Sequence, residues 1–407
     1  MNYSVTFTVD GQGSLTIGDQ LNLLTITAGS GDGMDVPQPS QLTASFLIDS
    51  TDQAGAFWLG RQIQVAITPT GQAAFDVFWG SVDTINVAPV NTEGTTAIIS
   101  LTATSQMAKL QNTQVGGAGF TANDEYFRAI ELRQEIGYCQ WQDVPVGLTW
   151  DDLDPTTTWT AFDSTLDRMS FFPYGFGGFN LEAYSSGATD ALSFIQDWIT
   201  GTGAWLFDEP DGSTTYFVAY DDWANVSPIT LDVSTCAIWD SLELNNDISN
   251  IYTNITFANS STSASYSNFN QLSAYGDRSV TIESQCADLN DLQTLATGRG
   301  IALSAPQAAL NTITIDLDLV SYTNMKKMMR FEAPTFWAFT NIPAIFGGNQ
   351  TYWQAGLNLQ LSYYHAEVDL VITPDSVRRG LTQWSEVPFQ WLWNNYQTAT
   401  TTWQQVT

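Results

Sequence analysis

Residues 37–67 read PQPSQLTASFLIDSTDQAGAFWLGRQIQVAI. Within this stretch, segments 42–49 and 61–67 alternate apolar and polar residues, which is typical of strands with one buried face. FDVFWGSVDTINV (75–87) and TAIISLTAT (96–104) extend the pattern, and clusters of Gly, Asn and Pro separate the segments. Short strands at this spacing favour an antiparallel barrel or sandwich in this part of the chain.

The middle of the chain adds helices. Apolar residues at helical spacing predict three of them, over 122–136, 188–203 and 287–305. Segment 204–220 is typical of a β-hairpin, with Asp211-Gly212 at the turn. The middle of the chain is therefore predicted to mix helices and strands.

Strand patterns return towards the C-terminus. LNTITIDLDLVS (310–321) has the clearest alternation, with Thr and Asp between aliphatic residues. LNLQLSYYHAEVDLVITP (357–374) fits either one long strand or two, and segments 248–259 and 278–284 also alternate. The sequence therefore predicts a mainly β, multidomain protein with α+β insertions.

The charge balance is strongly acidic. The 407 residues include 42 Asp or Glu and only 12 Lys or Arg, which gives a formal net charge of −30. A surface of this charge repels nucleic acid and anionic membranes at long range, so stable nucleic-acid binding is not expected. Two interpretations remain open: an adaptation for solubility or a salty medium, and a surface that lets DNA pass without holding it.

The chain is poor in residues for metal binding and catalysis. It has one histidine, His365, and three widely spaced cysteines, Cys139, Cys236 and Cys286. This set argues against a zinc site, a histidine-based triad and a disulfide framework. No nucleotide-binding loop or nucleophile elbow is present. We expect no catalytic residues, no cofactor, no metal site and no enzymatic activity.

Adjacent acids are frequent, as expected by chance in so acidic a chain. A glycosidase needs two carboxylates across a sugar, and no pair here is singled out for that role. The turn DEPDG (208–212) offers oxygen ligands for calcium but lacks the regular spacing of a dedicated calcium loop, so a plain hairpin turn is the favoured interpretation. Neither a signal peptide nor a membrane span is expected from the apolar segments.

One unusual motif occurs twice. WQDVPVGLTWDDLDPTTTW (141–159) and WSEVPFQWLWNNYQTATTTW (384–403) share Trp, an acid, Val-Pro, a second Trp and Thr-Thr-Thr-Trp. We call them the tryptophan ladders, and their indoles are the candidate partner-interface residues: Trp141, Trp150, Trp159, Trp384, Trp391, Trp393 and Trp403. The residue before each Pro favours an extended backbone, so each ladder is predicted to be a strap whose rings fill pockets on another surface. That surface is the same domain, a neighbouring subunit or, for an aromatic platform, a carbohydrate.

In the order of its motifs, the chain resembles the minor tail or baseplate hub proteins of long-tailed bacteriophages. The likeness begins with the stretch quoted above, its Leu-Gly-Arg turn and the following Phe-x-Gly-x-Val. It continues through DWITGTGAWLFDEPDGSTTYFVAYDDW (197–223) and a Tyr-Gly-x-Arg turn before the helix at 287–305, and it ends with the Thr-Trp tails. No lysozyme-like or peptidase-like extension is recognisable, so a wall-cleaving role is not expected.

The resemblance implies a structural virion protein at the tail tip or baseplate of a siphophage, assembled in the host cytoplasm. In such a homotrimer, β-barrel-like hub domains form a pseudo-sixfold ring that joins the hexameric tail tube to the threefold tip and lines part of the DNA ejection channel. The implied domains are an N-terminal β-barrel hub domain (1–110), an α+β middle domain with the first ladder (111–235), a second β/α hub region (236–375) and a C-terminal Trp-rich arm (376–407).

The implied partners are further copies of the chain, a distal tail or tail tube protein, the tape measure protein and tail tip or fibre proteins. Genomic DNA would pass transiently, without stable binding. The alternative is a carbohydrate- or receptor-binding tail protein, which the high aromatic content favours. A glycoside hydrolase or peptidase is the least supported interpretation.

Overall fold

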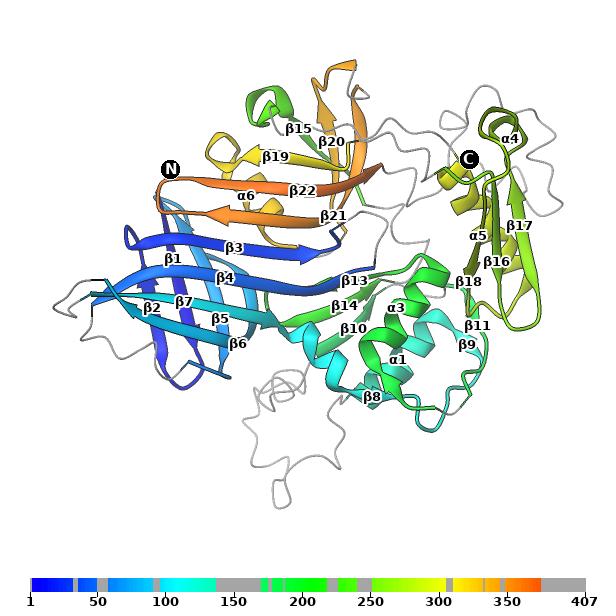
Figure 1. The fold of residues 1–407 in the computed structure, drawn as a ribbon, viewed down its shortest axis with the longest axis horizontal. Helices are drawn as coiled ribbons and strands as arrows, with labels where there is room; N and C mark the ends of the chain where they lie inside the picture. Colours follow the sequence, from blue (N-terminus) through cyan, green and yellow to red (C-terminus); the bar gives the residue numbers. More distant parts are fainter. Residues whose placement is uncertain are drawn as a thin grey trace.

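A computed structural model describes residues 2–31, 36–49, 58–90, 96–136, 170–174, 178–185, 187–217, 226–239, 251–304, 310–331, 334–344 and 348–374 (Figure 1). Its main feature is a 12-stranded sheet, with the order β15-β20-β21-β3-β4-β7-β6-β5-β1-β2 and with β22 pairing both β21 and β19. Two parts of the chain build this sheet, one N-terminal and one C-terminal.

We call the seven N-terminal strands the N-terminal unit. They are β1 (Tyr3–Val9), β2 (Gly13–Ile17), β3 (Leu21–Gly29), β4 (Gln38–Asp49), β5 (Gln62–Pro69), β6 (Phe75–Pro89) and β7 (Thr96–Ser105). The other five strands are the C-terminal unit: β15 (Ile229–Asp232), β19 (Thr312–Asp316), β20 (Phe336–Thr340), β21 (Gln350–Leu361) and β22 (Ala366–Pro374).

The N-terminal unit curls around an aromatic core. Phe7 on β1 stacks on Phe46 of β4 with ring centroids 5.1 Å apart, although four pairing steps separate these strands in the sheet. Trp58 completes the cluster at 6.1 Å from Phe7. Apolar residues at alternate positions place their side chains on the inner face, which explains why these strands form from the sequence. The predicted β-rich N-terminal part is confirmed.

The N-terminal and C-terminal units form one continuous sheet, because β21 pairs antiparallel with β3. Within the described residues, the ladder does not close on itself, so the sheet is an open curl and not a closed barrel. Helix α6 (Tyr322–Met329) buries three methionines against the curl, and the Tyr322 hydroxyl donates to the carbonyl of Ala73 at 2.9 Å. The barrel-like expectation therefore holds only for the curvature.

The middle unit packs beside this sheet (Figure 1). It holds the three-stranded sheet β10 (Ser170–Tyr174), β14 (Ser213–Phe217) and β13 (Trp205–Asp208), the 3-10 helix η2 (Gln106–Asn112), and the helices α1 (Glu125–Ile136) and α3 (Ala191–Thr202). Two short ladders add β8 (Gln114–Val115) with β12 (Thr189–Asp190), and β9 (Asn123–Asp124) with β11 (Asn180–Leu181).

Both predicted helices of the middle unit are confirmed, and α3 shows why. The Asp190 carboxylate accepts a hydrogen bond from the amide of Ser193 and so caps the first turn, which lowers the pKa of Asp190. Gly203 ends the helix at φ 81°, a left-handed conformation that favours glycine. The predicted hairpin is also confirmed, because β13 and β14 pair across a turn that contains Gly212 at φ 88°.

A smaller α/β unit lies at the far end of the molecule from β2 (Figure 1). It contains β16 (Asn254–Ala258), β17 (Ser263–Ser267), β18 (Ser279–Glu283), α4 (Phe269–Tyr275) and α5 (Leu289–Ser304). Helix α5 packs on β16 and β17 and confirms the helix predicted over 287–305. The 3-10 helix η6 (Val233–Thr235) follows β15.

One strand prediction needs correction, and one open alternative is decided. The segment 310–321 is a strand only as far as Asp316, whose carboxylate accepts from the amide of Asp318 and starts the 3-10 helix η9 (Leu317–Leu319). Capping by Asp316 thus outweighs the alternation, and Leu319 is exposed. For 357–374, the two-strand alternative is right, because the chain turns between β21 and β22 at 362–365.

Candidate functional site: the outer face of the large sheet

The outer face of the large sheet carries an unbroken row of polar side chains. Residues directly opposite each other in a sheet point to the same face, so the strand register defines this first row. From β19 to β5 it reads Thr314, Asp369, Asn358, Thr27, Gln41, Thr104, Ser81 and Gln62. Eight strands from both units therefore contribute one residue each to one line.

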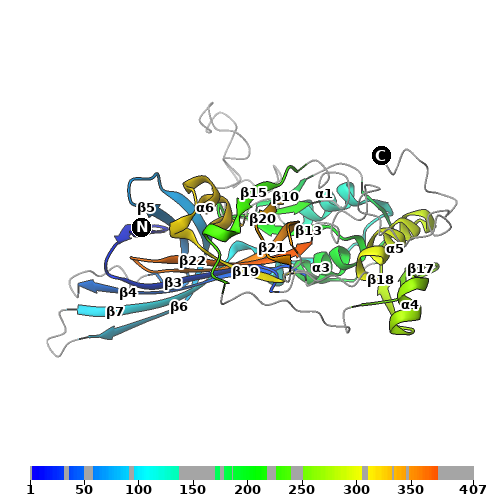
Figure 2. The same cartoon turned by 90° about the horizontal axis from the view of Figure 1, so that it is seen from above.

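A second row runs parallel to the first, two residues along each strand except β6, where a register shift after Val82 makes the step three residues. It reads Asp316, Glu367, Gln360, Thr25, Thr43, Thr102 and Thr84. We call the two rows together the polar face. Its members are half-buried or exposed, apart from Thr314, which is 8% exposed. In Figure 2, β5 and α6 lie to one side of β3, β4 and β7, and no other described element covers these strands from the opposite side.

Hydrogen bonds between neighbouring strands hold the side chains of the polar face. The Thr314 hydroxyl donates to Asp369 Oδ1 at 2.6 Å, and Asn358 Nδ2 donates to Asp369 Oδ2 at 3.2 Å. In the N-terminal unit, the hydroxyls of Thr84 and Thr102 lie 2.7 Å apart. Such pairs fix the rotamers, so the face presents ordered hydroxyls and amides to solvent.

The large sheet contains no Lys or Arg in any of its 12 described strands. Its acids, in contrast, include Asp83 beside Thr104, and Asp316, Glu367 and Asp369 at the C-terminal end of the rows. Protein binds the DNA backbone mainly through Lys and Arg, which release the counterions of the phosphates. The polar face therefore lacks the favourable counterion release that Lys and Arg would provide. It offers the phosphates of a DNA backbone only neutral or repulsive contacts.

At the seam where β1 meets the β21–β22 turn, several acids surround the single histidine. The Tyr3 hydroxyl donates to Asp318 Oδ1 at 2.6 Å, and burial together with this carboxylate raises the pKa of Tyr3. His365 Nε2 lies 3.4 Å from Glu367 Oε2, and its Nδ1 lies 3.9 Å from Asp318 Oδ2.

Ligand atoms of Asp316, Asp318 and His365 lie within 4.8 Å of one another, a spacing that could hold a metal ion. Tyr3 and a backbone amide already use oxygens of the two carboxylates. The Tyr3 amide also donates to the carbonyl of Tyr363 at 2.9 Å. The cluster therefore first of all holds the N-terminal strand against the C-terminal unit.

The cysteines play no reactive part in the described structure. Cys236 and Cys286 are buried free thiols, and burial raises their pKa to about 11 and about 12. A thiol with so high a pKa stays protonated and unreactive at neutral pH. Cys139 lies outside the described residues.

All seven tryptophans of the two ladders lie outside the described residues, so the candidate interface positions stay predictions. The DEPDG turn lies within them, at the end of β13, where it packs against the inner side of the large sheet. The polar face was missed from the sequence, because a row across eight strands depends on register, which alternation alone does not define. The signal that was present is the scarcity of Lys and Arg in the alternating segments, where Arg61 and Arg278, each at the start of its segment, are the only bases.

No helix of the described residues is long and apolar enough to cross a bilayer. The sequence matches no model of a protein family and no curated protein. Solved structures, in contrast, share the fold over nearly the whole chain.

Two of these similar structures are phage-type tail proteins. A tail protein from Neisseria meningitidis MC58 superposes with a TM-score of 0.59 and 14% identity, covering 93% of this chain and 98% of that one. The 43 kDa tail protein of prophage MuSo2 from Shewanella oneidensis gives 0.56 and 10% identity, covering 93% and 99%. The chain therefore shares the mainly β fold of these two tail proteins.

Proposed function

We propose that the chain is a structural subunit of a bacteriophage tail, acting as a homotrimeric hub at the tail tip or baseplate. The observation that carries the proposal is the polar face, a sheet surface free of Lys and Arg to which two units of one chain contribute. The fold shared with two tail proteins over 93% of the chain supports it. No enzymatic activity is part of this function.

The two-unit sheet suits a pseudo-sixfold ring. The N-terminal and C-terminal units meet through the β3–β21 ladder, so three copies would bring six sheet units together. Within the described residues, β2 and β15 each pair with one strand only and end the ladder. Unpaired edges of this kind are templates for pairing with another chain. Contact between copies at these ends would continue the sheet around a closed ring.

In such a ring the polar face lines the bore. Genomic DNA passing through would meet hydroxyls, amides and carboxylates, and it would slide because no counterions are released on contact. The ring would stack on the tail tube above and carry tip or fibre proteins below, with the tape measure protein leaving through the bore before the DNA. We place the chain at this position in a siphophage virion.

The oligomeric state of the purified full chain tests the ring. We expect a particle with three times the mass of the 44.7 kDa chain in light scattering or mass photometry. A substitution in the edge strand β2 checks the route of assembly: Thr16→Pro should reduce the trimer, because proline removes a backbone amide and blocks pairing at an edge. Thr16→Val keeps the amide and is the matched control. A monomer at every concentration tested would contradict the proposal.

The neutrality of the bore is tested by adding bases to the polar face. The triple variant Thr25→Lys, Thr43→Lys, Thr102→Lys places three cations on neighbouring strands of the second row. We expect it to retain double-stranded DNA in a salt-dependent manner, whereas the wild type and a Thr→Gln triple control do not. DNA retention by the wild type at physiological salt would overturn the assignment of this face to a bore.

A further inference from the structure

The seam between β1 and the β21–β22 turn, left without a role by the proposed function, is where the curl of the large sheet comes back on itself. In the sheet order, β1 is six pairing steps from β21. The Tyr3 amide nevertheless donates to the carbonyl of Tyr363 in the turn that follows β21. In Figure 1 and Figure 2, β1 begins beside the start of β22. We call Asp316, Asp318 and His365, which lie at this point, the seam cluster.

Neighbouring elements bring the seam cluster together. Asp316 ends β19 and lies opposite Glu367 near the start of β22, so the turn that carries His365 reaches the end of β19. Asp318 follows two residues later in η9. One ligand atom from each member lies within 4.8 Å of those of the other two, and His365 Nδ1 is 3.9 Å from Asp318 Oδ2. The three ligand atoms therefore converge on one small volume.

Each member of the seam cluster is also held by a second contact. Asp316 Oδ1 accepts from the amide of Asp318 at 2.9 Å, and Asp318 Oδ1 accepts from the Tyr3 hydroxyl at 2.6 Å. His365 Nε2 lies 3.4 Å from Glu367 Oε2. When Nε2 donates its proton to this carboxylate, Nδ1 keeps its lone pair on the side of Asp318. Partners of this kind orient the ligands of protein metal sites and raise the basicity of the imidazole.

The charge around the seam cluster is negative. Glu367 adds a third carboxylate to the two of the cluster, and His365 is charged only when it is protonated. Within the residues that the structure describes, no Lys or Arg forms an ion pair with Asp316 or Glu367. A bound divalent ion would balance two of these carboxylates.

We propose that the seam cluster binds one divalent ion of the zinc class through Asp316, Asp318 and His365, with water as the fourth ligand. An imidazole nitrogen beside carboxylates suits Zn²⁺ and its first-row neighbours, whereas Ca²⁺ and Mg²⁺ prefer oxygen alone. Three protein ligands and one water are a known zinc set. The set needs a single histidine, so the scarcity of His and Cys in the sequence does not argue against it.

The seam cluster is accessible and close to the geometry that the ion needs. The side chain of His365 is 49% exposed, which provides an entry path and room for the water ligand. Bonds of about 2.0–2.2 Å require ligand atoms roughly 3–3.5 Å apart, so small rotations of the three side chains complete the site.

The ion would fasten the seam. It would join the β19–η9 segment to the β21–β22 turn, and Asp318 in turn holds Tyr3 of β1. Removal of the ion should therefore loosen the first strand of the chain. The inference does not depend on trimer formation, since all three ligands belong to one chain.

Metal titration of the full chain tests the site, after dialysis against EDTA and removal of the chelator. We expect one equivalent of Co²⁺ to give the visible absorption of a four-coordinate site, and Zn²⁺ to abolish it. At about a hundredfold excess over its Kd, Zn²⁺ should raise the melting temperature of the wild type by a few degrees. Hydrogen exchange of the β1 amides should become slower with Zn²⁺.

Three variants locate the ion. His365→Gln changes an exposed side chain and should weaken Co²⁺ binding by at least about tenfold and remove the thermal response. Asp318→Asn keeps an acceptor for the Tyr3 hydroxyl but loses the charge; it should also weaken Co²⁺ binding, while unfolding in EDTA stays cooperative. Asp19→Asn, an exposed acid in the turn before β3, is the matched control and should behave like the wild type.

Either of two results would overturn the proposal. One is a wild-type chain that shows neither the Co²⁺ absorption nor a thermal response to Zn²⁺, which would leave the seam held by hydrogen bonds alone. The other is a response that His365→Gln leaves unchanged, or that His365→Gln and Asp19→Asn reduce equally, which would indicate nonspecific binding to the acidic surface.

Discussion

The N-terminal and C-terminal units of the large sheet bury their strands in different ways. In the N-terminal unit, β1 and β5 alternate between buried and half-exposed residues, because only the inner face is covered. In the C-terminal unit, six consecutive residues of β21, 352–357, are buried. Alternation in the sequence therefore marks a strand with one free face, and its loss marks a place where another layer packs.

Both faces of β21 are covered by other parts of the chain. Trp353 meets Trp205 of the middle unit edge to face, with ring centroids 4.6 Å apart. The next residue, Gln354, points to the opposite face, where its Oε1 accepts from Trp337 Nε1 at 2.9 Å. Its Nε2 donates to the carbonyl of Met328 in α6 at 3.4 Å. In the C-terminal unit, β21 thus contacts the middle unit through one face and α6 through the other.

The largest expected effect comes from removing the indole at this junction. Trp353→Ala should lower the free energy of unfolding by about 3–5 kcal/mol, because a fully buried ring leaves a cavity. Phe46→Ala should cost a similar amount in the N-terminal unit. The two variants should differ in whether they affect the middle unit. Hydrogen exchange of the β13 amides should become faster in Trp353→Ala and stay unchanged in Phe46→Ala. Equal exchange of β13 in both variants would break the comparison.

The second prediction concerns charge at the other contact of the middle unit. Asp208 has a pKa of about 6 in the fold against an ordinary 3.8, so the folded chain holds this proton more tightly than the unfolded chain. Its contribution to stability is fully present below about pH 4 and is lost as the pH rises through about 6. Asp208→Asn should therefore stabilise the chain above pH 6, by up to about 3 kcal/mol.

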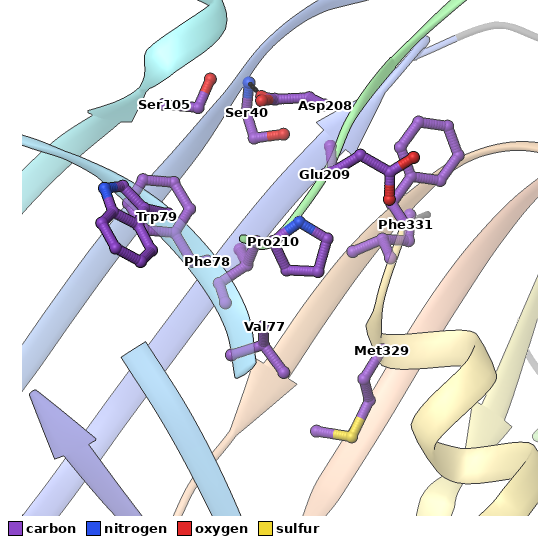
Figure 3. Close-up of a pocket in the computed structure, with 13 residues that line it drawn as sticks. Ser40, Val77, Phe78, Trp79, Ser105, Asp208, Glu209, Pro210, Met329 and Phe331 are labelled. Atoms are coloured by element: carbon purple, nitrogen blue, oxygen red, sulfur yellow. Dashed lines mark hydrogen bonds between the residues drawn. The ribbon is translucent and has the colours of Figure 1, made fainter. Parts of the chain in front are cut away.

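Thermal unfolding of the wild type and Asp208→Asn between pH 8 and pH 4 measures this difference. The gap between the two melting temperatures should shrink as the pH falls through 6. A variant less stable than the wild type at pH 8 would show that the hydrogen bonds to the carboxylate, among them the one from the Ser40 amide (Figure 3), outweigh the cost of its burial, contrary to the raised pKa.

A third variant isolates the hydrogen bond on the far face of β21. Gln354→Met keeps the volume of the side chain but leaves the buried Trp337 N–H without an acceptor, which should cost about 1–3 kcal/mol in urea denaturation. The double-mutant cycle with Trp337→Phe provides the control, because the cost of Gln354→Met should fall once the indole N–H is absent. A cost that does not change would assign the effect to packing alone.

The same contrast explains how much could be predicted from the sequence. Short-range sequence patterns determine some elements, and these were predicted correctly. They are the strands with one buried face, such as 42–49 and 61–67, the helices with local caps, and the hairpin at Asp211-Gly212. Helix α6 was missed, although Ser321 caps it by accepting from the amide of Asn324. Its three buried methionines lie at i, i+3 and i+4, which is helical spacing, but the eight residues of α6 are shorter than the window in which this pattern can be recognised.

The junction and the polar face depend on contacts between distant segments. Asp208 and Ser40 are 168 residues apart, and no local pattern connects them. In the same way, Thr27 joins Asn358 in one row only because β3 pairs with β21 in one register. The acidic composition left two interpretations open, an adaptation for solubility and a surface that lets DNA pass, and only the strand register shows which polar side chains share one face.

The smallest expected effect is on the outer face of the N-terminal unit. Thr102→Val removes the hydroxyl that lies 2.7 Å from Thr84 without changing the shape of the side chain. The loss should be about 0.2–1 kcal/mol, since the pair is exposed to solvent. Chemical denaturation should compare this variant with Ala103→Gly, on the buried face of the same strand. The substitution at the buried position should lower the free energy of unfolding more. A larger loss for Thr102→Val would mean that the polar face is covered.

A cryo-electron microscopy reconstruction of the assembled particle tests the central claim most directly. We predict three copies around one axis, with the row from Thr314 to Gln62 turned towards the bore and no Lys or Arg from the large sheet along it. A particle in which this face points outward, or in which a single copy stands alone, would contradict the claim.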